Sequence, residues 1–375
     1  MQNKNNNLPL LEIDFIEFYV GNAKQAAYFY QDYFGFEIIA FAGLETGDKR
    51  KTSYLLVQQN IRIVLTSSLI PNSEISDHVK SHGDGVKFIA FLVEDSKLAY
   101  HNTVNKGAEK YLLPNLIYDK NGEIIISGIK VYGDTVHLFV ERKNYNGLFL
   151  PGFKKFKKKK PPIDFRLKNI DHVVANVGWN QMNEWVNFYS TVMGFSNLIT
   201  FDDKDISTKY TALMSKVMIN SNNKIKFPIN EPAKGIKKSQ IEEFIEFYNG
   251  PGCQHIALLS EDIIFSVKNM RSKGVEFLEV PKTYYDKLFE RCGQIDEDLS
   301  ILRNLGILVD KDEEGYLLQI FTKPVMDRPT FFFEIIQRKG SNSFGKGNFK
   351  ALFEAIELEL SLIHISEPTR QAEMA

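Results

Sequence analysis

Apolar residues in this chain are gathered in short runs that predict strands, and two aromatic-rich stretches predict helices. The helices are expected at residues 23–33 and 181–193, each after a short apolar strand that opens one half of the chain. Gly35 and Gly194 follow them, where a helix ends and a positive φ is tolerated. Further strands are expected at residues 51–57, 61–66, 86–93, 210–220, 253–260, 316–322 and 330–337. The pattern therefore predicts βαβββ units.

Three polar residues lie inside such apolar runs: His172 in Ile-Asp-His-Val-Val, His255 in Gly-Cys-Gln-His-Ile-Ala and Glu334 in Phe-Phe-Phe-Glu-Ile-Ile-Gln. Burying an unpaired imidazole or carboxylate costs free energy. Two histidines and one carboxylate on separate strands can hold one face of a ferrous ion and leave the other face open for oxygen and substrate. The alternative is that each is a hydrogen-bonded core or edge residue, which is the commoner case for a single buried polar side chain.

An internal repeat favours the metal site. Residues 13–16, 34–36, 84–90 and 106–109 reappear, in the same order, as residues 170–173, 193–195, 251–257 and 273–276. When Arg142 is aligned with Arg338, the three candidate ligands stand opposite Phe15, Phe88 and Leu138. A set that is polar in one copy and apolar in the other behaves as a unit. We therefore expect the second half to hold the metal and the first half to be structural.

Composition limits the class of protein. The 375 residues suffice for two domains, each with its own core, and 43% hydrophobic with 25% charged residues is typical of a soluble globular protein. A formal net charge of -1 gives no global field to recruit nucleic acid or an anionic membrane, so the expected partner is a small molecule. Cys253 and Cys292 form no CxxC pair. No signal peptide or membrane-spanning run is evident, and a cytoplasmic location is expected.

Several separate strings between residues 13 and 357 resemble the 4-hydroxyphenylpyruvate dioxygenase family of the vicinal oxygen chelate superfamily. They are residues 170–174, 228–232, 238–241, 252–257, 332–338 and 344–349. The resemblance implies an α+β fold of tandem paired βαβββ modules. Each of the two domains would be an open β-barrel flanked by helices, and a C-terminal lid helix would follow.

The same resemblance implies Fe(II) as the cofactor, with His172, His255 and Glu334 as its ligands. The substrates would be 4-hydroxyphenylpyruvate and O2. The products would be homogentisate and CO2, formed in tyrosine and phenylalanine catabolism by oxidative decarboxylation, ring hydroxylation and side-chain migration. Members of the family imply a homo-oligomer, either a dimer or a tetramer.

By resemblance, Ser215, Asn230 and Gln240 form a hydrogen-bond network near the substrate ring or its hydroxyl, and Gln254 and Gln319 lie near the iron. An apolar pocket with a few polar anchors is the usual composition of such a site. The residues alone leave alternatives open. Ser215 and Asn230 could be turn residues, and Gln240 could begin a helix at residues 241–248.

Aromatic residues are expected to form the pocket wall. Phe321 lies two residues after Gln319, and Phe332 lies two before Glu334, so strand alternation places each on the face of its polar neighbour. The alternative is an ordinary aromatic core, since the chain has 29 phenylalanines.

A loop and a C-terminal helix are expected to cover the site. By resemblance, Phe344, Asn348, Phe349 and Leu352 belong to this cover, and apolar residues recur at helical spacing up to Leu360. Asn348 could instead cap the helix. A cover that excludes water would protect a reactive oxidant.

These expectations divide the chain into four parts. Residues 1–150 form a structural domain without metal ligands, and residues 166–357 form the catalytic iron domain. Residues 151–165 form a basic, proline-containing linker, expected to be solvated rather than to bind phosphate or acidic partners. Residues 358–375 resemble peptides translated from sequencing-adapter DNA. They are expected to be a non-native tail that contributes to neither fold nor chemistry.

Three other functions are considered. The first is 4-hydroxymandelate synthase, which uses the same substrate and ligands, but Phe332 and the Pro-Ile-Asn string at residues 228–230 resemble the ring-hydroxylating type. The second is an extradiol catechol dioxygenase, whose chemistry needs acid–base side chains beside the metal. The third is a non-catalytic binding protein, which retention of all three ligands disfavours.

Overall fold

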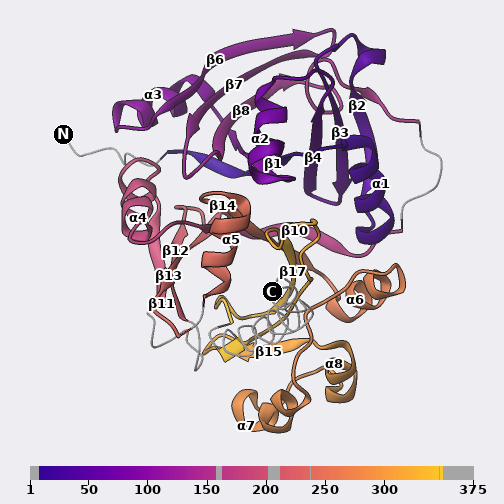
Figure 1. Ribbon diagram of the computed structural model, residues 1–375, viewed down its shortest axis with the longest axis vertical. Coiled ribbons are helices and arrows are strands. Elements are labelled where there is room, and N and C mark those ends of the chain that lie inside the picture. Colours follow the sequence, from indigo (N-terminus) through magenta and orange to yellow (C-terminus); the bar gives the residue numbers. More distant parts are fainter. Residues whose placement is uncertain (1–7, 158–162, 202–211, 237, 346, 349–375) are drawn as a thin grey trace, which may run out of the picture.

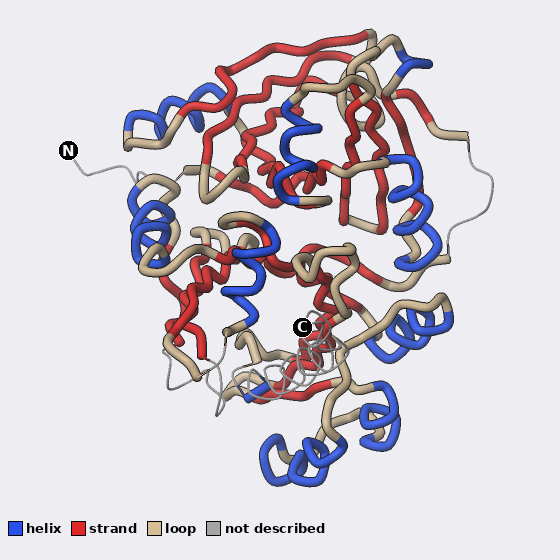
Figure 2. The backbone as a smooth tube through the Cα atoms, viewed as in Figure 1, coloured by secondary structure: helices blue, strands red, loops and turns tan. Residues whose placement is uncertain are grey.

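The computed structural model describes residues 8–157, 163–201, 212–236, 238–345 and 347–348. These residues form two strongly curled sheets, one in each half of the chain, with helices packed around them (Figure 1 and Figure 2). The first half lies at the top of Figure 1 and the second half below it. The expected pair of open barrels is therefore present.

The first half contains a nine-stranded sheet with the order β6-β7-β8-β5-β1-β4-β3-β2-β9. Its elements are β1 (Leu10–Tyr19), α1 (Ala23–Phe34), β2 (Glu37–Ala42), β3 (Lys51–Gln58), β4 (Ile61–Ser68), α2 (Glu74–His82), β5 (Gly85–Val93), α3 (Ser96–Asn105), β6 (Lys110–Asp119), β7 (Gly122–Lys130), β8 (Val136–Tyr145) and β9 (Lys154–Lys155).

The second half contains an eight-stranded sheet with the order β11-β12-β13-β10-β14-β17-β16-β15. Its elements are β10 (Leu167–Asn176), α4 (Met182–Thr191), β11 (Ser196–Phe201), β12 (Ala212–Ile219), β13 (Lys226–Ala233), α5 (Gln240–Tyr248), β14 (Gly252–Ser260), α6 (Ile263–Ser272), α7 (Leu288–Cys292), α8 (Leu299–Leu305), β15 (Leu308–Lys311), β16 (Tyr316–Phe321) and β17 (Phe332–Lys339).

Strand order and direction repeat between the halves. β1 is parallel to β4 and antiparallel to β5, and β5 is parallel to β8. β10 has the same relations to β13 and β14, and β14 to β17. Each half is therefore a pair of βαβββ units, and the predicted fold class is confirmed. The second half differs by the helices α7 and α8, inserted between α6 and β15.

The ends of α1 show why the sequence folds this way locally. The Asn22 side chain accepts a hydrogen bond from the Gln25 backbone N–H and so caps the first turn. Gly35 ends the helix with φ 75°, and a Cβ there would lie 2.6 Å from the Ile163 carbonyl oxygen. Gly194 has φ 72° at the corresponding place after α4. Both positions therefore favour glycine, as the sequence indicates.

The main apolar core runs through both halves, and a second apolar cluster lies inside the first barrel alone. The ring centroids of Phe18 and Phe331 lie 5.0 Å apart across the boundary, and those of Phe34 and Phe333 also lie 5.0 Å apart. Strand alternation explains this contact, because Phe331 and Phe333 point out of the second barrel whereas their neighbour Phe332 points into it. The outer faces of the two barrels thus share one core.

Part of the predicted linker is paired with the first sheet. Lys154 and Lys155 form β9, which pairs with β2, and the Phe156 backbone N–H donates to the Ile39 carbonyl at 2.8 Å. The two lysine side chains remain exposed, so this stretch is solvated on one side only. Residues 158–162 lie outside the described residues.

The described helices include none with the length and apolar character that a membrane span requires. Both cysteines are buried and free of disulfide bonds.

Candidate metal centre

Three neighbouring strands bring His172, His255 and Glu334 together inside the second barrel. The strands are β10, β14 and β17, and their register places His172 beside Ala257 and Ala257 beside Glu334. Glu334 Oε2 lies 3.2 Å from His172 Nε2 and 3.5 Å from His255 Nε2. The three candidate ligand atoms lie within 4.8 Å of one another, and all three residues are buried. The arrangement suits a single metal ion.

Asp171 and Arg338 support His172 from outside the triad. Asp171 Oδ1 lies 2.8 Å from His172 Nδ1, and Arg338 binds both oxygens of Asp171 at 2.7 Å. A buried carboxylate at Nδ1 keeps the proton on that nitrogen, so Nε2 is left to bind a metal. The arginine compensates the charge of Asp171.

His255 is supported in a similar way. Its Nδ1 lies 3.0 Å from Gln254 Oε1, which accepts the ring proton. Phe332 stacks on the imidazole with ring centroids 4.7 Å apart and planes 19° apart. Both contacts fix the plane of the ring and direct Nε2 toward Glu334.

Two β-bulges explain how each histidine and its support can both lie at the site. In a regular strand, adjacent residues point to opposite faces. The pairing of β10 with β14 skips Asp171 on one strand and Gln254 on the other, so both are bulged residues. A bulge re-aims side chains. Asp171 can therefore contact His172, and Gln254 can contact His255, despite being neighbours in sequence.

Electrostatics favour a cation at this position. Burial alone would raise the pKa of Glu334, but the two histidines lower it to about 2. Burial opposes protonation of His172, yet Glu334 and Asp171 raise its pKa, whereas burial lowers the pKa of His255. The pKa of Asp171 is held well below its usual value, against its burial, by Arg338 and His172. The set is an ionised carboxylate facing two imidazoles.

The donor types fit a divalent transition metal. Imidazole and carboxylate suit ferrous iron, zinc and manganese, whereas thiolates select softer ions. Burial raises the pKa of the nearby Cys253 thiol, and its Sγ contacts the His255 carbonyl oxygen at 3.7 Å. Cys253 belongs to the core between the halves and does not compete for the metal.

A small cavity of about 30 Å³ adjoins the three ligands. Four of the predicted pocket residues line it, namely Ser215, Asn230, Phe321 and Phe344. Such a volume admits a water molecule but not an aromatic acid, whose sites usually measure several hundred cubic ångströms. Phe344 packs edge-on against His172 with ring centroids 5.1 Å apart. Side chains that line the cavity, of which Phe344 is one, would therefore have to move to admit an aromatic acid.

The other predicted pocket residues lie in different surroundings. Gln319 is buried, and its Oε1 has no hydrogen-bond partner among the described residues. Gln240 is the first residue of α5, as the structural alternative expected, and is not among the described residues that line the cavity. Asn348 is buried and accepts a hydrogen bond from the Tyr284 hydroxyl at 2.6 Å. Phe349, Leu352 and the expected lid helix lie outside the described residues.

Asp171, Arg338 and Asn176 belong to the site although the sequence pattern did not predict them as site residues. Asn176 lies at the end of β10, where its Oδ1 accepts from Asn230 Nδ2 at 3.4 Å. A signal for the first two was present in the repeat, because Ile13-Asp14 matches Ile170-Asp171 and the two arginines align. Strict strand alternation concealed it, since it places Asp171 on the face opposite His172.

Comparisons with known proteins agree with this geometry. Residues 5–150 match the family model "Hydroxyphenylpyruvate dioxygenase, HPPD, N-terminal", and residues 169–320 match the Glyoxalase/Bleomycin resistance protein/Dioxygenase superfamily. The chain is 47% identical to the 4-hydroxyphenylpyruvate dioxygenase of Dictyostelium discoideum, covering 92% of this chain and 96% of that protein. It is 46% identical to the enzyme of that name from Yarrowia lipolytica, with 92% and 91% covered.

Among solved structures, a mutant 4-hydroxymandelate synthase from Streptomyces coelicolor is similar, with a TM-score of 0.85 and 30% identity over 94% of this chain and 100% of that one. The Mn(II)-bound glyoxalase from Novosphingobium aromaticivorans shares the fold, with a TM-score of 0.50 and 11% identity over 88% and 82% of the two chains. The higher identity to the dioxygenases, over nearly the full length of both chains, decides the family. This chain belongs to the 4-hydroxyphenylpyruvate dioxygenases.

Proposed function

We propose that this chain converts 4-hydroxyphenylpyruvate and O2 to homogentisate and CO2, with Fe(II) held by His172, His255 and Glu334. Membership of the family supports the reaction. The observation that carries the site is the convergence of three buried ligand atoms beside a cavity. Fe(II), when bound, would take the 2-oxo acid as a chelating ligand and activate O2, because two histidines and a carboxylate leave coordination positions open.

The supporting residues hold the ligands in their binding form. Asp171 and Gln254 accept the Nδ1 protons of the two histidines, so both Nε2 atoms are presented to the metal without rearrangement. Partners of this kind typically contribute 10-fold to 100-fold in metal affinity or activity. Arg338 keeps Asp171 ionised and in place.

The cavity residues would bind the aromatic ring. Ser215 and Asn230 stand opposite each other on β12 and β13 and offer polar atoms for the ring hydroxyl. Phe321 and Phe332 provide apolar walls next to His255. Gln319 Oε1 has no partner among the described residues and is free to accept a hydrogen bond from a substrate hydroxyl.

Phe344 would cover the bound substrate after the displacement that admits it. Its ring lies against His172 and is buried, so it excludes water from the metal side of the cavity. Roles for Gln240, Asn348, Phe349 and Leu352 stay predictions of the family resemblance. So do the structural role of residues 1–150, the homo-oligomer and the cytoplasmic location.

Oxygen consumption tests the proposal. Metal-free protein reconstituted with Fe(II) is expected to consume oxygen only when 4-hydroxyphenylpyruvate is present, and chromatography with mass detection is expected to find homogentisate. Protein reconstituted with Zn²⁺ is the matched control and is expected to be inactive. Oxygen uptake without the 2-oxo acid, or no product in its presence, would contradict the proposal.

A second candidate is 4-hydroxymandelate synthesis, which the structural similarity to a synthase of that name favours. The lower identity to that protein, 30% against 46–47%, weighs against it. The same product analysis separates the two, because the synthase would yield 4-hydroxymandelate. An extradiol mechanism is disfavoured, since the polar side chains that line the cavity beside the triad are Ser215 and Asn230, and the nearby Asp171 is paired with Arg338.

A further inference from the structure

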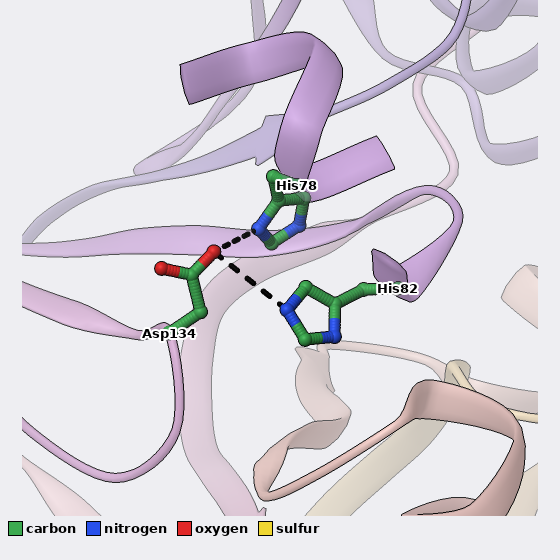
Figure 3. A group of neighbouring side chains, drawn as sticks. All are labelled: His78, His82 and Asp134. Atoms are coloured by element: carbon green, nitrogen blue, oxygen red, sulfur yellow. Dashed lines mark hydrogen bonds and ion pairs between the residues drawn. The ribbon is translucent and has the colours of Figure 1, made fainter. Parts of the chain in front are cut away.

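A second group of side chains that could hold a metal ion, His78, His82 and Asp134, lies in the first half (Figure 3). His78 and His82 are one turn apart on α2, so both imidazoles extend from the same face of the helix. Asp134 reaches them from the turn between β7 and β8. Asp134 Oδ2 lies 2.7 Å from His78 Nδ1 and 3.7 Å from His82 Nε2.

His82 and Asp134 have the outer partners that metal ligands usually have, whereas His78 Nε2 has no hydrogen-bond partner among the described residues. His82 Nδ1 donates to the Tyr248 carbonyl oxygen at 2.5 Å, which leaves its Nε2 lone pair directed at Asp134. The other carboxylate oxygen of Asp134 accepts a hydrogen bond from Lys87. Ligating histidines typically donate their second N–H in this way, and ligating carboxylates are themselves hydrogen-bonded. Burial also lowers the pKa of His82, which favours the neutral imidazole.

All three potential ligands of this group are present in the first half, and all three are replaced at the equivalent positions of the second half. The segment from Gly83 to Gly85, between α2 and β5, matches Gly250 to Gly252, between α5 and β14. This alignment of the two halves makes Ile245 and Asn249 the equivalents of His78 and His82. Phe88 pairs with Val136 in the first half, and the equivalent His255 pairs with Phe332 in the second. Val136 and Phe332 are therefore equivalent, and Thr330 is the equivalent of Asp134. Three potential ligands in one copy correspond to three residues of other types in the second copy.

We propose that His78, His82 and Asp134 form a second divalent-cation site, with zinc as the ion that suits them best. Zinc takes imidazole and carboxylate ligands at about 2.0–2.2 Å in a tetrahedron, which sets ligand atoms roughly 3.4 Å apart. The distances from Asp134 Oδ2 to His78 Nδ1, 2.7 Å, and to His82 Nε2, 3.7 Å, lie on either side of that value. Both histidines are buried, whereas the Asp134 side chain is 37% exposed and gives the ion and a water ligand access from solvent.

The local charge also favours a cation. Lys87 Nζ is buried between Asp134 and Glu74, so two carboxylates face one ammonium group. A bound zinc ion would compensate the remaining negative charge. The competing interpretation is a hydrogen-bonded network in which a proton on one of the histidines does the same.

The site would connect the two halves. Tyr248 is the last residue of α5 in the second half, and its ring stacks on His82 with centroids 4.5 Å apart. Zinc on His82 would therefore fix α2 against α5. The proposal does not depend on the reaction at the iron centre, because none of its residues belongs to the predicted triad or pocket.

Metal stoichiometry tests the proposal directly. The full-length protein is stripped with a chelator, equilibrated with Zn²⁺, desalted and analysed for bound zinc. We expect about two zinc ions per chain in the unmodified protein, because both sites accept zinc, and one in either His255→Ala or His82→Gln. His101→Gln is the matched control, since His101 is an exposed histidine outside both groups, and it is expected to keep two.

His82→Gln retains an amide that can donate to the Tyr248 carbonyl, and circular dichroism checks its fold. Asp134→Asn is the second variant and is also expected to bind one ion. Two zinc ions in both His82→Gln and Asp134→Asn, or a single ion in the unmodified protein that both variants retain, would overturn the proposal. A Co²⁺ titration of His255→Ala gives an independent readout. The visible absorption of tetrahedral cobalt is expected there and is expected to disappear when His82→Gln is added.

Discussion

The two halves of this chain share one architecture but differ at the positions that carry chemistry. His172, His255 and Glu334 correspond in strand register to Phe15, Phe88 and Leu138. These three apolar residues are buried together in a cluster of their own inside the first barrel. The scaffold therefore accepts either a metal set or an apolar set at the same place, and the metal centre is not needed for the fold.

The framework around the metal centre is retained in both halves. Asp14 is bulged as Asp171 is, and Arg142 Nε binds Asp14 at 2.7 Å as Arg338 binds Asp171. Arg142 also donates to the carbonyl of Phe149, whose ring lies 5.0 Å from Phe15. In the second half, Phe344 occupies the same place against His172. The aspartate–arginine pair is therefore a structural device of the barrel, which the second half also uses to orient a ligand.

The polar pair beside the metal also has a counterpart. Ser53 pairs with Thr66 as Ser215 pairs with Asn230. In the first half these groups satisfy one another, because Ser53 Oγ lies 2.7 Å from Thr66 Oγ1, which donates to Glu17 at 2.6 Å. In the second half, Ser215 and Asn230 line a cavity. The polar network of the first barrel is therefore closed, because its members bond one another. The network of the second barrel is open, because its groups face a cavity and are available to a ligand.

The strongest test of this comparison is His255→Ala. We expect iron content and turnover to fall to background, while the far-ultraviolet circular dichroism spectrum is unchanged, since Phe88 shows that the position needs no polar group. The free energy of unfolding of the metal-free protein is expected to change by only about 1 kcal/mol. Loss of the folded spectrum would show that the histidine is structural, and retained iron would show that it is not a ligand.

Removal of the two equivalent arginines is expected to give unequal effects. Arg338→Met leaves Asp171 buried without its guanidinium partner, so the free energy of unfolding is expected to fall by about 3 kcal/mol and iron affinity by about 10-fold to 100-fold. Arg142→Met is expected to cost less, because Arg62 still binds Asp14 at 2.8 Å, and to leave iron affinity unchanged. Denaturant titration and iron titration measure both variants. Equal effects on iron affinity would contradict the assigned support of His172.

Substitution of Gln254 tests the hydrogen bond that supports His255. Gln254→Leu removes the acceptor for the His255 Nδ1 proton and is expected to weaken iron binding by about 10-fold. Gln254→Glu keeps an acceptor of similar shape and is expected to retain most of the affinity. If the two variants bind iron equally well, the hydrogen bond has no role in holding the ligand.

The smallest effects are expected from substitutions in the two polar pairs, Ser215–Asn230 and Ser53–Thr66. Ser215→Ala is expected to raise KM about threefold to tenfold, the equivalent of one hydrogen bond to substrate, with little change in stability. Ser53→Ala is expected to lower the free energy of unfolding by about 1 kcal/mol and to leave KM unchanged, since its partners lie within the protein. A KM effect in the first variant that is absent in the second distinguishes an open from a closed network.

Much of the fold could be predicted from sequence, because apolar runs and terminating glycines are local signals. β3, β5 and β14 lie within about one residue of the predicted strands, and the repeat indicated the equivalence of the halves. The repeat also indicated that His172, His255 and Glu334 act together. These predictions needed no knowledge of how the barrels pack.

Other features depend on tertiary structure. The common core could not be foreseen, because Phe331 and Phe333 are apolar on the outer face of a strand whose inner face is also apolar. The support from Asp171 depends on a bulge that breaks strand alternation. The group around His82 joins two histidines on one helix to an aspartate in a distant turn, and the histidine spacing alone does not indicate which residue completes the group.

Anomalous diffraction at the iron edge, from crystals of the Fe(II)-reconstituted protein grown without oxygen, tests the central claim most directly. We expect the strongest peak within about 2.0–2.2 Å of His172 Nε2, His255 Nε2 and Glu334 Oε2. A strongest peak at His78, His82 and Asp134, or none between the three predicted ligands, would contradict the account.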